Sequence, residues 1–592
     1  MPVIANRMQE RSDPFRLGVF YLGLLAAVGL ASCERGSSTN RNEATSGDKT
    51  ARGDRSSAGQ WFVEITGDVG LNFVHETGAT GELHMPEIMA SGVALVDYDN
   101  DGDLDLYFTN GNHSLPKAKA EPPPMNRLYR QEPGGRFVDV TQASGLGDGG
   151  YGMGVVFGDI DNDGYVDAFV ANYGPSRLYR NRGDGTFADI TEKAGINVDG
   201  WSCSVAMLDY DRDGFLDIYV TRYLKFDHFK KCTDRAGRPN YCDPKAYEPV
   251  HDVLLHNNGN GAFSDVSERA GILAGPPYAG LGVVCGDFNQ DGWQDIYVAN
   301  DGHPNNLWIN QKDGTFRDDA FASGCALNAQ GKAEAGMGVV AADLDNDADL
   351  DFFITHLSGE TNTIYRNLGG ETGFEDATAA TGVGAPSLPW TGFGTAAFDA
   401  ELDGDLDLVV VNGRVSRADP PAGVKIKPPW DEYAEPNLFQ VSDGAGRFTL
   451  ACEMAREFCE PLEITRGLAV GDIDSDGDID LVISNIQGPA RMYRNDAPQK
   501  GHWLIVRAVD PRLKREAIGA QVTVTCAGRK WVGTVQAGSS YLSHSDTRLH
   551  FGLGDCAAVD QIEVRWPDGL AERFDGTPAD RVMEINRGTG TK

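Results

Sequence analysis

The chain consists of short apolar segments that alternate with turns rich in aspartate and glycine. Residues 152–157 (GMGVVF) precede one such turn, and residues 168–172 (AFVAN) follow it. Apolar runs of this length, bounded by turn residues, predict β-strands. The composition agrees with this, because 73 glycines among 592 residues imply many tight turns. We therefore expect an all-β protein.

The turns repeat one acidic pattern, D-x-D-x-D-G-x-x-D. Four copies match it fully: Asp97-Asp99-Asp101-Asp105, Asp159-Asp161-Asp163-Asp167, Asp209-Asp211-Asp213-Asp217 and Asp472-Asp474-Asp476-Asp480. Three copies depart from it: Asp287-Asn289-Asp291-Asp295, Asp343-Asp345-Asp347-Asp351 with Ala348 in place of the glycine, and Asp399-Glu401-Asp403-Asp407. Spacings of 50 to 78 residues between copies indicate one structural unit, present seven times, with variable loops.

The acids of each copy are spaced as ligands of a hard cation. Oxygens at positions 1, 3 and 5 converge because the glycine at position 6 allows a sharp turn, and position 9 closes the ring. An EF-hand needs a glutamate at position 12 and a helix on each side, whereas strand-like segments flank these loops. Solvated turns could explain one copy, but not seven. The sequence predicts about seven calcium sites, with weaker ones in the fourth to sixth copies, where Asn289 lowers the ligand charge and Ala348 replaces glycine.

A second phrase follows the loops and completes a unit of four strands. In the second unit it consists of residues 178–181 (LYRN), 185–191 (GTFADIT) and 194–196 (AGI). Four short strands make one β-propeller blade. The seventh unit lacks the later part of this phrase, but residues 62–66 (FVEIT) carry it at the front of the chain. We therefore predict a seven-bladed β-propeller with cation-binding hairpin loops over residues 61–498, closed by the N-terminal strand so that no sheet edge stays open.

These repeats resemble the FG-GAP or VCBS blades of integrin α-subunit heads and of many bacterial surface proteins. Finer phrases, such as residues 85–89 (MPEIM) and 300–305 (NDGHPN), are similar to the cartilage acidic protein family and its bacterial relatives. Residues 517–520 (AIGA), 539–543 (SSYLS) and 549–554 (LHFGLG) resemble the ASPIC/UnbV domain that follows the propeller in that family. Alternating apolar residues between these phrases predict strands, so we expect a small β-sandwich-like domain over residues 499–592.

The thirteenth residue after the first aspartate marks the far end of the strand that follows each loop. These residues are Asn110, Asn172, Arg222, Asn300, His356, Asn412 and Asn485. Propeller geometry puts all seven around one mouth of the channel, opposite the cation loops, and insertions at residues 111–124, 224–250 and 414–436 leave from the same end. We expect either a ligand-binding rim, which would include Asp301 and His303, or side chains that only cap strand ends.

The N-terminus has the features of an export signal. Three arginines precede an apolar run over residues 17–31 that is too short for a membrane-spanning helix. The run ends in Leu30-Ala31-Ser32-Cys33, which resembles the bacterial lipobox, so we expect residues 1–32 to be removed and Cys33 to be lipidated. A flexible tether over residues 33–60 follows. The prediction is an exported protein, lipid-anchored in the bacterial envelope, with the outer membrane or cell surface favoured.

Nine cysteines follow Cys33, and an exported protein can oxidise them. We expect three disulfides, Cys232–Cys242, Cys452–Cys459 and Cys526–Cys556. Cys203, Cys285 and Cys325 are left over, and an odd count leaves at least one free thiol. No C-x-x-C or Cys/His spacing indicates a zinc site.

Three functions fit these features. A formal net charge of −35 argues against nucleic acid, so the first hypothesis is a monomeric module that binds a protein or carbohydrate and reaches the membrane only through its lipid. The second is a metal- or cofactor-dependent enzyme at the mouth, where His303, His356 and Glu360 could meet, joined by His75 and His84; no nucleophile elbow, HExxH or phosphate-binding glycine loop is present. The third is a calcium-rigidified spacer.

Overall fold

The structure is a computed structural model that describes residues 59–112, 124–499 and 501–592. These residues form one compact unit. No helix within the described ranges is long and apolar enough to cross a membrane. The predicted signal peptide, Cys33 and the tether up to residue 58 lie outside the described residues. The described α-helices are single turns: α1 (Pro86–Met89), α2 (Thr141–Ser144), α3 (Thr378–Thr381), α4 (Gly384–Ser387) and α5 (Arg456–Cys459).

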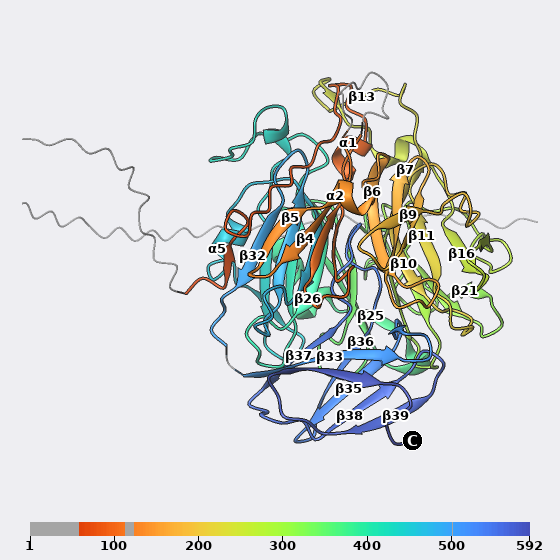
Figure 1. The fold of residues 1–592 in the computed structure, drawn as a ribbon. Coiled ribbons are helices and arrows are strands. Elements are labelled where there is room, and N and C mark those ends of the chain that lie inside the picture. Colours follow the sequence, from red (N-terminus) through yellow and green to blue (C-terminus); the bar gives the residue numbers. More distant parts are fainter. Residues whose placement is uncertain (1–58, 113–123, 500) are drawn as a thin grey trace, which may run out of the picture. The chain divides into compact units, whose positions relative to one another are not determined.

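Seven four-stranded antiparallel sheets follow one another along the chain (Figure 1). The first comprises β2 (Val93–Val96), β3 (Asp105–Phe108), β4 (Arg127–Glu132) and β5 (Arg136–Asp139). The second comprises β6 (Tyr151–Gly158), β7 (Asp167–Tyr173), β8 (Arg177–Asn181) and β9 (Phe187–Asp189). The third comprises β10 (Ser202–Leu208), β11 (Asp217–Arg222), β16 (Val253–Asn257) and β17 (Phe263–Asp265).

The remaining four sheets have the same order. The fourth comprises β18 (Gly280–Gly286), β19 (Asp295–Asn300), β20 (Asn306–Asn310) and β21 (Phe316–Asp318). The fifth comprises β22 (Val339–Ala342), β23 (Asp351–Ile354), β24 (Thr363–Asn367) and β25 (Phe374–Asp376). The sixth comprises β26 (Gly392–Phe398), β27 (Asp407–Asn412), β28 (Leu438–Ser442) and β29 (Phe448–Leu450). The seventh comprises β30 (Thr465–Gly471), β31 (Asp480–Asn485), β32 (Arg491–Asn495) and β1 (Phe62–Glu64).

The seven sheets close into a propeller. Their first strands contact one another in the cycle β2, β6, β10, β18, β22, β26, β30 and back to β2. The outer strand of the seventh blade comes from the N-terminal side, because β1 pairs antiparallel with β32 and Phe62 lies opposite Asn495. The prediction of a seven-bladed propeller is confirmed, and the closing strand is the one that the sequence indicated.

Close approach of backbones holds neighbouring blades together at the centre. A methyl group on Gly154 would lie 2.3 Å from Cys203 O of the next blade, and one on Gly338 would lie 2.1 Å from Phe393 O. Only glycine permits such contacts. Threonine hydroxyls on the second strands add bonds across the same seam, since Thr221 Oγ1 donates to Leu281 O at 3.0 Å and Thr355 Oγ1 to Phe393 O at 2.7 Å.

Each blade presents its acidic loop at one end and the strand-end residue at the other. In the second blade, Gly158 at the end of β6 pairs with Asp167 of the loop, whereas Gly152 at its start pairs with Asn172. The other inner hairpins follow the same register, for example Gly286 with Asp295 and Gly280 with Asn300. The acidic loops therefore lie at one mouth of the propeller, and the predicted rim lies at the other.

The C-terminal domain consists of two four-stranded sheets that share a hydrophobic core. One contains β34 (Arg515–Glu516), β33 (His502–Asp510), β37 (Leu549–Gly554) and β40 (Arg581–Asn586), with β33 and β40 parallel. The other contains β36 (Arg529–Thr534), β35 (Gln521–Cys526), β38 (Gln561–Arg565) and β39 (Ala571–Asp575). This arrangement agrees with the predicted β-sandwich-like domain.

Residues 537–546, which connect β36 to β37, insert into the ring of inner strands; we call them the plug. Backbone amides of three blades donate to the plug: Met207 N to Ala537 O (3.0 Å), Val339 N to Ser540 O (3.1 Å) and Leu95 N to His544 O (2.9 Å). Its serine hydroxyls accept from two more blades: Ser540 Oγ from Thr395 N (2.9 Å), Ser543 Oγ from Leu468 N (3.2 Å) and Ser545 Oγ from Val470 N (3.2 Å).

The plug reaches the remaining two blades by packing. A methyl group on Gly154 would lie 3.4 Å from Leu542 Cα, and one on Gly282 would lie 3.2 Å from Ser540 O. The plug therefore touches the inner strand of every blade, and its tip residues Tyr541 and Leu542 are fully buried. The channel of the propeller is filled by the C-terminal domain.

The long insertion of the third blade has structure of its own at the opposite mouth. Two short ladders, β12 (Leu224–Lys225) with β15 (Glu248–Pro249) and β13 (Cys232–Thr233) with β14 (Pro239–Asn240), precede β16. The Cys232–Cys242 disulfide, with its Cα atoms 5.1 Å apart, ties the insertion together.

Candidate functional site

The seven acidic loops share one backbone conformation. The residue at position 4 is left-handed in every loop, with φ between 58° and 64°, and position 6 has φ between 75° and 102°. Glycine occupies position 6 in six loops, and Ala348 accepts φ 75° in the fifth. Ala348 therefore holds the left-handed conformation that glycine adopts in the other six loops.

Hydrogen bonds to the first and ninth acids fold each loop, as the first loop shows. The Asp97 carboxylate accepts from Asp101 N and Gly102 N, both at 3.1 Å. The Asp105 carboxylate accepts from Tyr98 N at 3.3 Å and from Gln131 N, on the third strand, at 2.8 Å. Asp105 is fully buried, so this acid anchors the loop to its blade.

The loops hold more carboxylate oxygens than the fold itself uses. In at least four loops, three of the acids have ligand oxygens within 4.8 Å of one another. These are Asp97-Asp99-Asp101, Asp159-Asp161-Asp167, Asp209-Asp211-Asp213 and Asp343-Asp345-Asp347. The third-position acid of these loops has one buried oxygen without a hydrogen-bond partner among the described residues: Asp99 Oδ1, Asp161 Oδ1, Asp211 Oδ1 and Asp345 Oδ1. Buried acceptors without a donor are uncommon in proteins, and these oxygens are the atoms of the loops that could hold a cation.

Electrostatics point in the same direction. Burial raises the pKa of Asp97 to about 6, and the neighbouring charges of Asp101 and Asp99 raise it as well. Burial likewise raises the pKa of Asp105 to about 8. Carboxylates that are costly to ionise in an empty loop become stable as anions when a divalent cation lies between them.

The C-terminal domain contacts the loops of several blades. Trp531 Nε1 donates to Gly404 O at 2.9 Å, and Arg529 bonds both Gly404 O and the Asp405 carboxylate of the sixth loop. His550 Nε2 lies 2.9 Å from Gly477 O of the seventh loop, and Arg565 Nη1 lies 3.3 Å from Asp287 Oδ2 of the fourth. The loop face is therefore an interface with the C-terminal domain.

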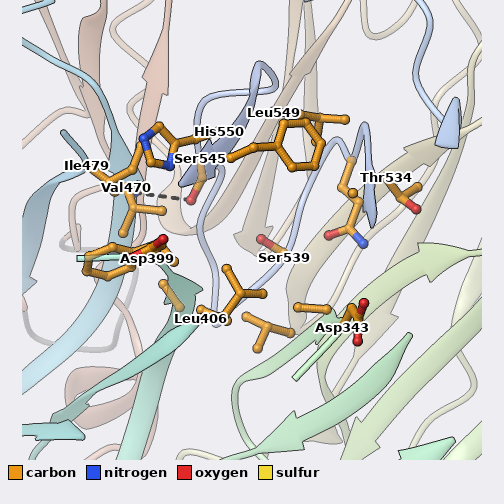
Figure 2. A pocket seen from close by; sticks show the side chains of 18 of the residues that line it. Asp343, Asp399, Leu406, Val470, Ile479, Thr534, Ser539, Ser545, Leu549 and His550 are labelled. Atoms are coloured by element: carbon orange, nitrogen blue, oxygen red, sulfur yellow. Dashed lines mark hydrogen bonds between the residues drawn. The ribbon is translucent and has the colours of Figure 1, made fainter. Parts of the chain in front are cut away.

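A small pocket remains between this domain and the fifth to seventh blades (Figure 2). It measures about 200 Å³, and both Asp343 and Asp399, the first acids of the fifth and sixth loops, line it together with His550 and Thr534. The hydrogen bond from Val470 N to Ser545 Oγ (3.2 Å) joins the two sides. The pocket is part of the interface between loops and plug.

At the other mouth, the predicted rim residues serve the fold. Asn300 Nδ2 donates to Pro304 O (2.7 Å) and Asn306 Oδ1 (2.8 Å), and Asn412 Nδ2 donates to Pro436 O (2.7 Å). Asn110, Asn172 and Asn485 make comparable bonds: Asn110 Oδ1 accepts from Glu76 N, Asn172 Nδ2 donates to Asp148 Oδ2, and Asn485 Nδ2 donates to Glu463 Oε2, all at 2.8 Å. All five asparagines are buried. These five side chains therefore bond backbone and side-chain groups next to the strand ends.

The histidines predicted to lie near this mouth make different contacts. His356 is buried, its pKa is lowered to about 4 by that burial, and its Nε2 lies 4.0 Å from Glu334 Oε2. His303 contacts Asp301 O through Nδ1 (2.9 Å) and stacks on Tyr278, whereas His84 packs edge-on against Phe226. Burial also lowers the pKa of His75 to about 3. The His84 ring also lies 6.3 Å from the His228 ring, and the charge of Glu360 acts to raise the pKa of His356.

A cavity of about 420 Å³ opens at this mouth. Apolar side chains line most of it, including Met85, Ile88, Met337 and Phe393, and the disulfide-tied insertion forms one wall through Tyr241, Cys242 and neighbouring residues. Two acids, Asp243 and Asp301, lie in the wall. Tyr223 Oη bonds the Asp301 carboxylate, and burial raises the pKa of Asp301 to about 6. An apolar cavity with a few polar groups is the usual form of a ligand site.

Sequence reasoning found Asp301 but missed the residues that shape this cavity. Arg466 is fully buried, and it holds α1 in place because its Nε donates to Ile88 O (2.8 Å) while its Nη1 donates to Gly413 O (3.0 Å) of the sixth blade. Tyr541 of the plug supports the same helix, since its hydroxyl donates to Met89 O at 2.9 Å. The sequence signal for this arrangement was that an arginine, Arg466, stands in an inner strand.

The structure forms the three disulfides that the sequence predicted. Cys452–Cys459 and Cys526–Cys556 have Cα separations of 5.7 and 6.6 Å, beside the Cys232–Cys242 pair described above. Cys203, Cys285 and Cys325 are free and buried.

Comparisons with known proteins agree with this architecture. Residues 97–170, 159–220, 246–298, 287–354 and 343–410 match the FG-GAP-like repeat, and residues 510–592 match the ASPIC and UnbV family. Cartilage acidic protein 1 of Xenopus tropicalis is 28% identical over 298 residues, which cover 49% of this chain and 42% of that protein. The Mus musculus protein of the same name is 27% identical over 358 residues, which cover 57% of this chain and 51% of that protein. The match therefore spans about half the length of these relatives.

Among solved structures, the BP39L lectin from Burkholderia pseudomallei covers 69% of this chain and 97% of its own. The sequence identity is 10% and the TM-score is 0.41.

Proposed function

The chain belongs to the family of FG-GAP-repeat proteins that carry an ASPIC and UnbV domain, and from this premise we propose that it is an exported, lipid-anchored binding module. In this proposal calcium fills the acidic loops, the C-terminal domain covers the loop face, and a protein or glycan binds at the opposite mouth. The anchor is the lipid on Cys33, so the mouth faces a partner outside the cytoplasm.

One observation supports the proposal, which is that among the described residues the C-terminal domain covers one mouth of the propeller and not the other. The plug fills the channel and the C-terminal domain contacts the loops, so no ligand can pass through the propeller. The cavity of about 420 Å³ at the other mouth combines apolar walls with Asp301 and with an insertion held by a disulfide. Binding sites on loops that a rigid scaffold holds are the common arrangement.

The chemistry of the cavity favours a ligand with an apolar face and a hydrogen-bond donor. Tyr223, Tyr241 and Phe393 line the cavity, with Tyr241 7% exposed and the other two rings fully buried, and aromatic side chains provide large contact areas at low entropic cost. The Asp301 carboxylate is an acceptor for a hydroxyl or an amine. A sugar ring has both features, and so does a peptide side chain with an amino group.

The acids fit a hard cation. The residues at positions 1, 3, 5 and 9 of each loop would hold calcium, and the bound ion neutralises carboxylates that otherwise repel one another. At a calcium concentration ten times the dissociation constant, one such site adds about 1.4 kcal/mol to the free energy of unfolding. The C-terminal domain contacts these loops, so calcium bound in the loops would also stabilise the contact between the propeller and the C-terminal domain.

Metal analysis tests the calcium proposal. The full chain, purified without chelator, should contain about five to seven calcium ions by plasma mass spectrometry, and EDTA should lower its melting temperature strongly. Fewer than about three calcium ions together with an unchanged melting temperature in EDTA would overturn it.

Array binding tests the mouth. The full chain is applied to a glycan array and to a peptide array in calcium buffer, next to an Asp301→Asn variant and a control variant, Asp419→Asn, whose carboxylate is exposed and outside the cavity wall. A ligand of the mouth should be lost in the first variant and kept in the second. Equal binding by both variants, or no binding on either array, contradicts the proposed mouth and favours the spacer hypothesis.

A further inference from the structure

The third acidic loop differs from the others in one residue close to its ninth acid, and this residue lies on the third strand of the blade. In each blade, one residue of the third strand bonds the ninth acid through its backbone amide, and we compare the residue that precedes it. The preceding residue is Arg130, Arg180, Arg366 or Arg494 in four blades and Ile309 or Val441 in two. In the third blade it is His256, because Asn257 N donates to Asp217 Oδ1 at 2.8 Å.

Two of the arginines at this position, Arg180 and Arg366, form ion pairs with loop acids. Arg180 lies 2.5 Å from Asp161 and 3.0 Å from Asp163, and Arg366 lies 2.8 Å from Asp345. A guanidinium keeps its charge and has no lone pair, so it can only compete with a metal ion for these oxygens. An imidazole in the same place can donate a nitrogen lone pair to the ion.

His256 is placed as a ligand would be. Its Nδ1 lies 3.1 Å from Asp217 Oδ1 and 3.5 Å from Asp211 Oδ2, and these three atoms lie within 4.8 Å of one another. The imidazole packs edge-to-face with the Tyr210 ring, and the two ring centroids are 5.9 Å apart. One nitrogen and two carboxylates therefore converge on a single point.

A second observation concerns the first acid of the same loop. Asp209 is 6% exposed, and its Oδ1 is buried without a hydrogen-bond partner among the described residues. Asp211 Oδ1 is likewise buried and has no hydrogen-bond partner among the described residues. Asp209, Asp211 and Asp213 also lie within 4.8 Å of one another through ligand oxygens. The third loop therefore holds two buried acceptors without donors, and one of them belongs to Asp211, the acid that His256 also contacts.

We propose that the third loop is a mixed histidine–carboxylate site that takes a first-row transition-metal dication such as Mn²⁺ in preference to Ca²⁺. Oxygen-only loops suit calcium, whereas an imidazole nitrogen adds affinity for borderline metals and little for calcium. The site rests on the proposal that these loops bind cations, and it assigns a different ion to one of them.

Pulsed electron paramagnetic resonance tests this assignment directly. The full chain is saturated with calcium, about one equivalent of Mn²⁺ is added, and coupling of the manganese electron to a ¹⁴N nucleus is recorded. We expect bound Mn²⁺ with histidine nitrogen coupling in the wild-type chain. In His256→Gln the coupling should vanish and the affinity for Mn²⁺ should fall at least about tenfold.

Two further variants complete the test. His251→Gln removes a half-buried histidine five positions away and should leave the signal unchanged. Arg180→His places an imidazole at the same position of the second blade and should create a second nitrogen-coupled site, so the assignment stays testable even if His256→Gln fails to fold.

The outcomes separate this inference from the calcium proposal. Mn²⁺ without nitrogen coupling, or no retained Mn²⁺ while calcium fills the other loops, would overturn the third-loop site alone and leave His256 as an ion-pair partner of Asp217. A chain that keeps nitrogen-coupled Mn²⁺ but holds no calcium would support this site and overturn the calcium proposal.

Discussion

At the scale of single residues, substitution of Ala348 measures the backbone strain at position 6 of one loop. Its φ of 75° is a conformation that costs a residue with a Cβ about 1–2 kcal/mol, and glycine escapes this cost but loses about 0.5–1 kcal/mol of backbone entropy. Ala348→Gly should therefore raise the free energy of unfolding by about 0.5–1 kcal/mol. Urea unfolding in excess calcium measures the change.

The first loop provides the reverse experiment. Gly102 has φ 97°, and a methyl group there would touch no atom within 4 Å, so Gly102→Ala adds backbone strain without a clash. It should lower the free energy of unfolding by about 1 kcal/mol. Changes of the same sign in the two variants would contradict the account of position 6.

The loop acids could be predicted from sequence because their geometry is local. Nine consecutive residues contain every acid of a loop, and the glycine explains the turn. The role of the strand-end asparagines could not be chosen in this way, since Asn412 bonds Pro436 O, 24 residues further along the chain. His256 was missed for the same reason, because it meets Asp217 from 39 residues away.

At the scale of elements, β1 closes the ring, and one aromatic residue carries much of that closure. Phe62 is fully buried, with ring centroids 5.3 Å from Phe439 and 6.0 Å from Phe458. Phe62→Ala should lower the free energy of unfolding by about 3–5 kcal/mol. Phe229→Ala, at a side chain that is 83% exposed, should change it by less than about 0.5 kcal/mol; denaturant curves of both variants check this, and equal effects would refute the closing role of β1.

The sequence indicated β1 and missed the plug, and the two elements differ in how they are stabilised. β1 repeats a phrase that other blades carry, so its partner strand could be inferred. The plug has no strand periodicity, and its hydrogen bonds go to inner strands of five different blades. In the sequence, residues 539–543 stand out only by their resemblance to a family phrase. Nothing in the local sequence shows that serine hydroxyls there accept hydrogen bonds from the backbone amides of the inner strands.

At the scale of the whole molecule, the proposed anchor is tested in cells. The wild-type chain expressed in a bacterium should incorporate labelled fatty acid, and Cys33→Ser should abolish the label, because the thiol is the acylated group. Cys203→Ser is a control, since that thiol is buried in the propeller. Label in Cys33→Ser, or none in the wild-type chain, would overturn the lipoprotein assignment.

The plug makes propeller and C-terminal domain one cooperative structure, and glycine substitutions can separate them. Gly538 has φ 93°, and a methyl group on it would lie 2.1 Å from Val205 O of the third blade. Gly528 has φ 87° with no atom within 4 Å of such a methyl group, so an alanine at either position adds similar backbone strain of about 1 kcal/mol. Only Gly538→Ala also forces the plug away from its blade, which adds about 1–3 kcal/mol of overpacking.

Calorimetry of the full chain in calcium should therefore give one transition for the wild-type chain and for Gly528→Ala. Gly538→Ala should give an early second transition in which the C-terminal domain separates first, and limited proteolysis should then cut near residues 537–546. Since the C-terminal domain also contacts the loops through Trp531 and His550, calcium removal should produce the same separation in the wild-type chain. A single transition in Gly538→Ala, shifted no further than in Gly528→Ala, would mean that the loop contacts alone hold the domain and that the plug only occupies the channel.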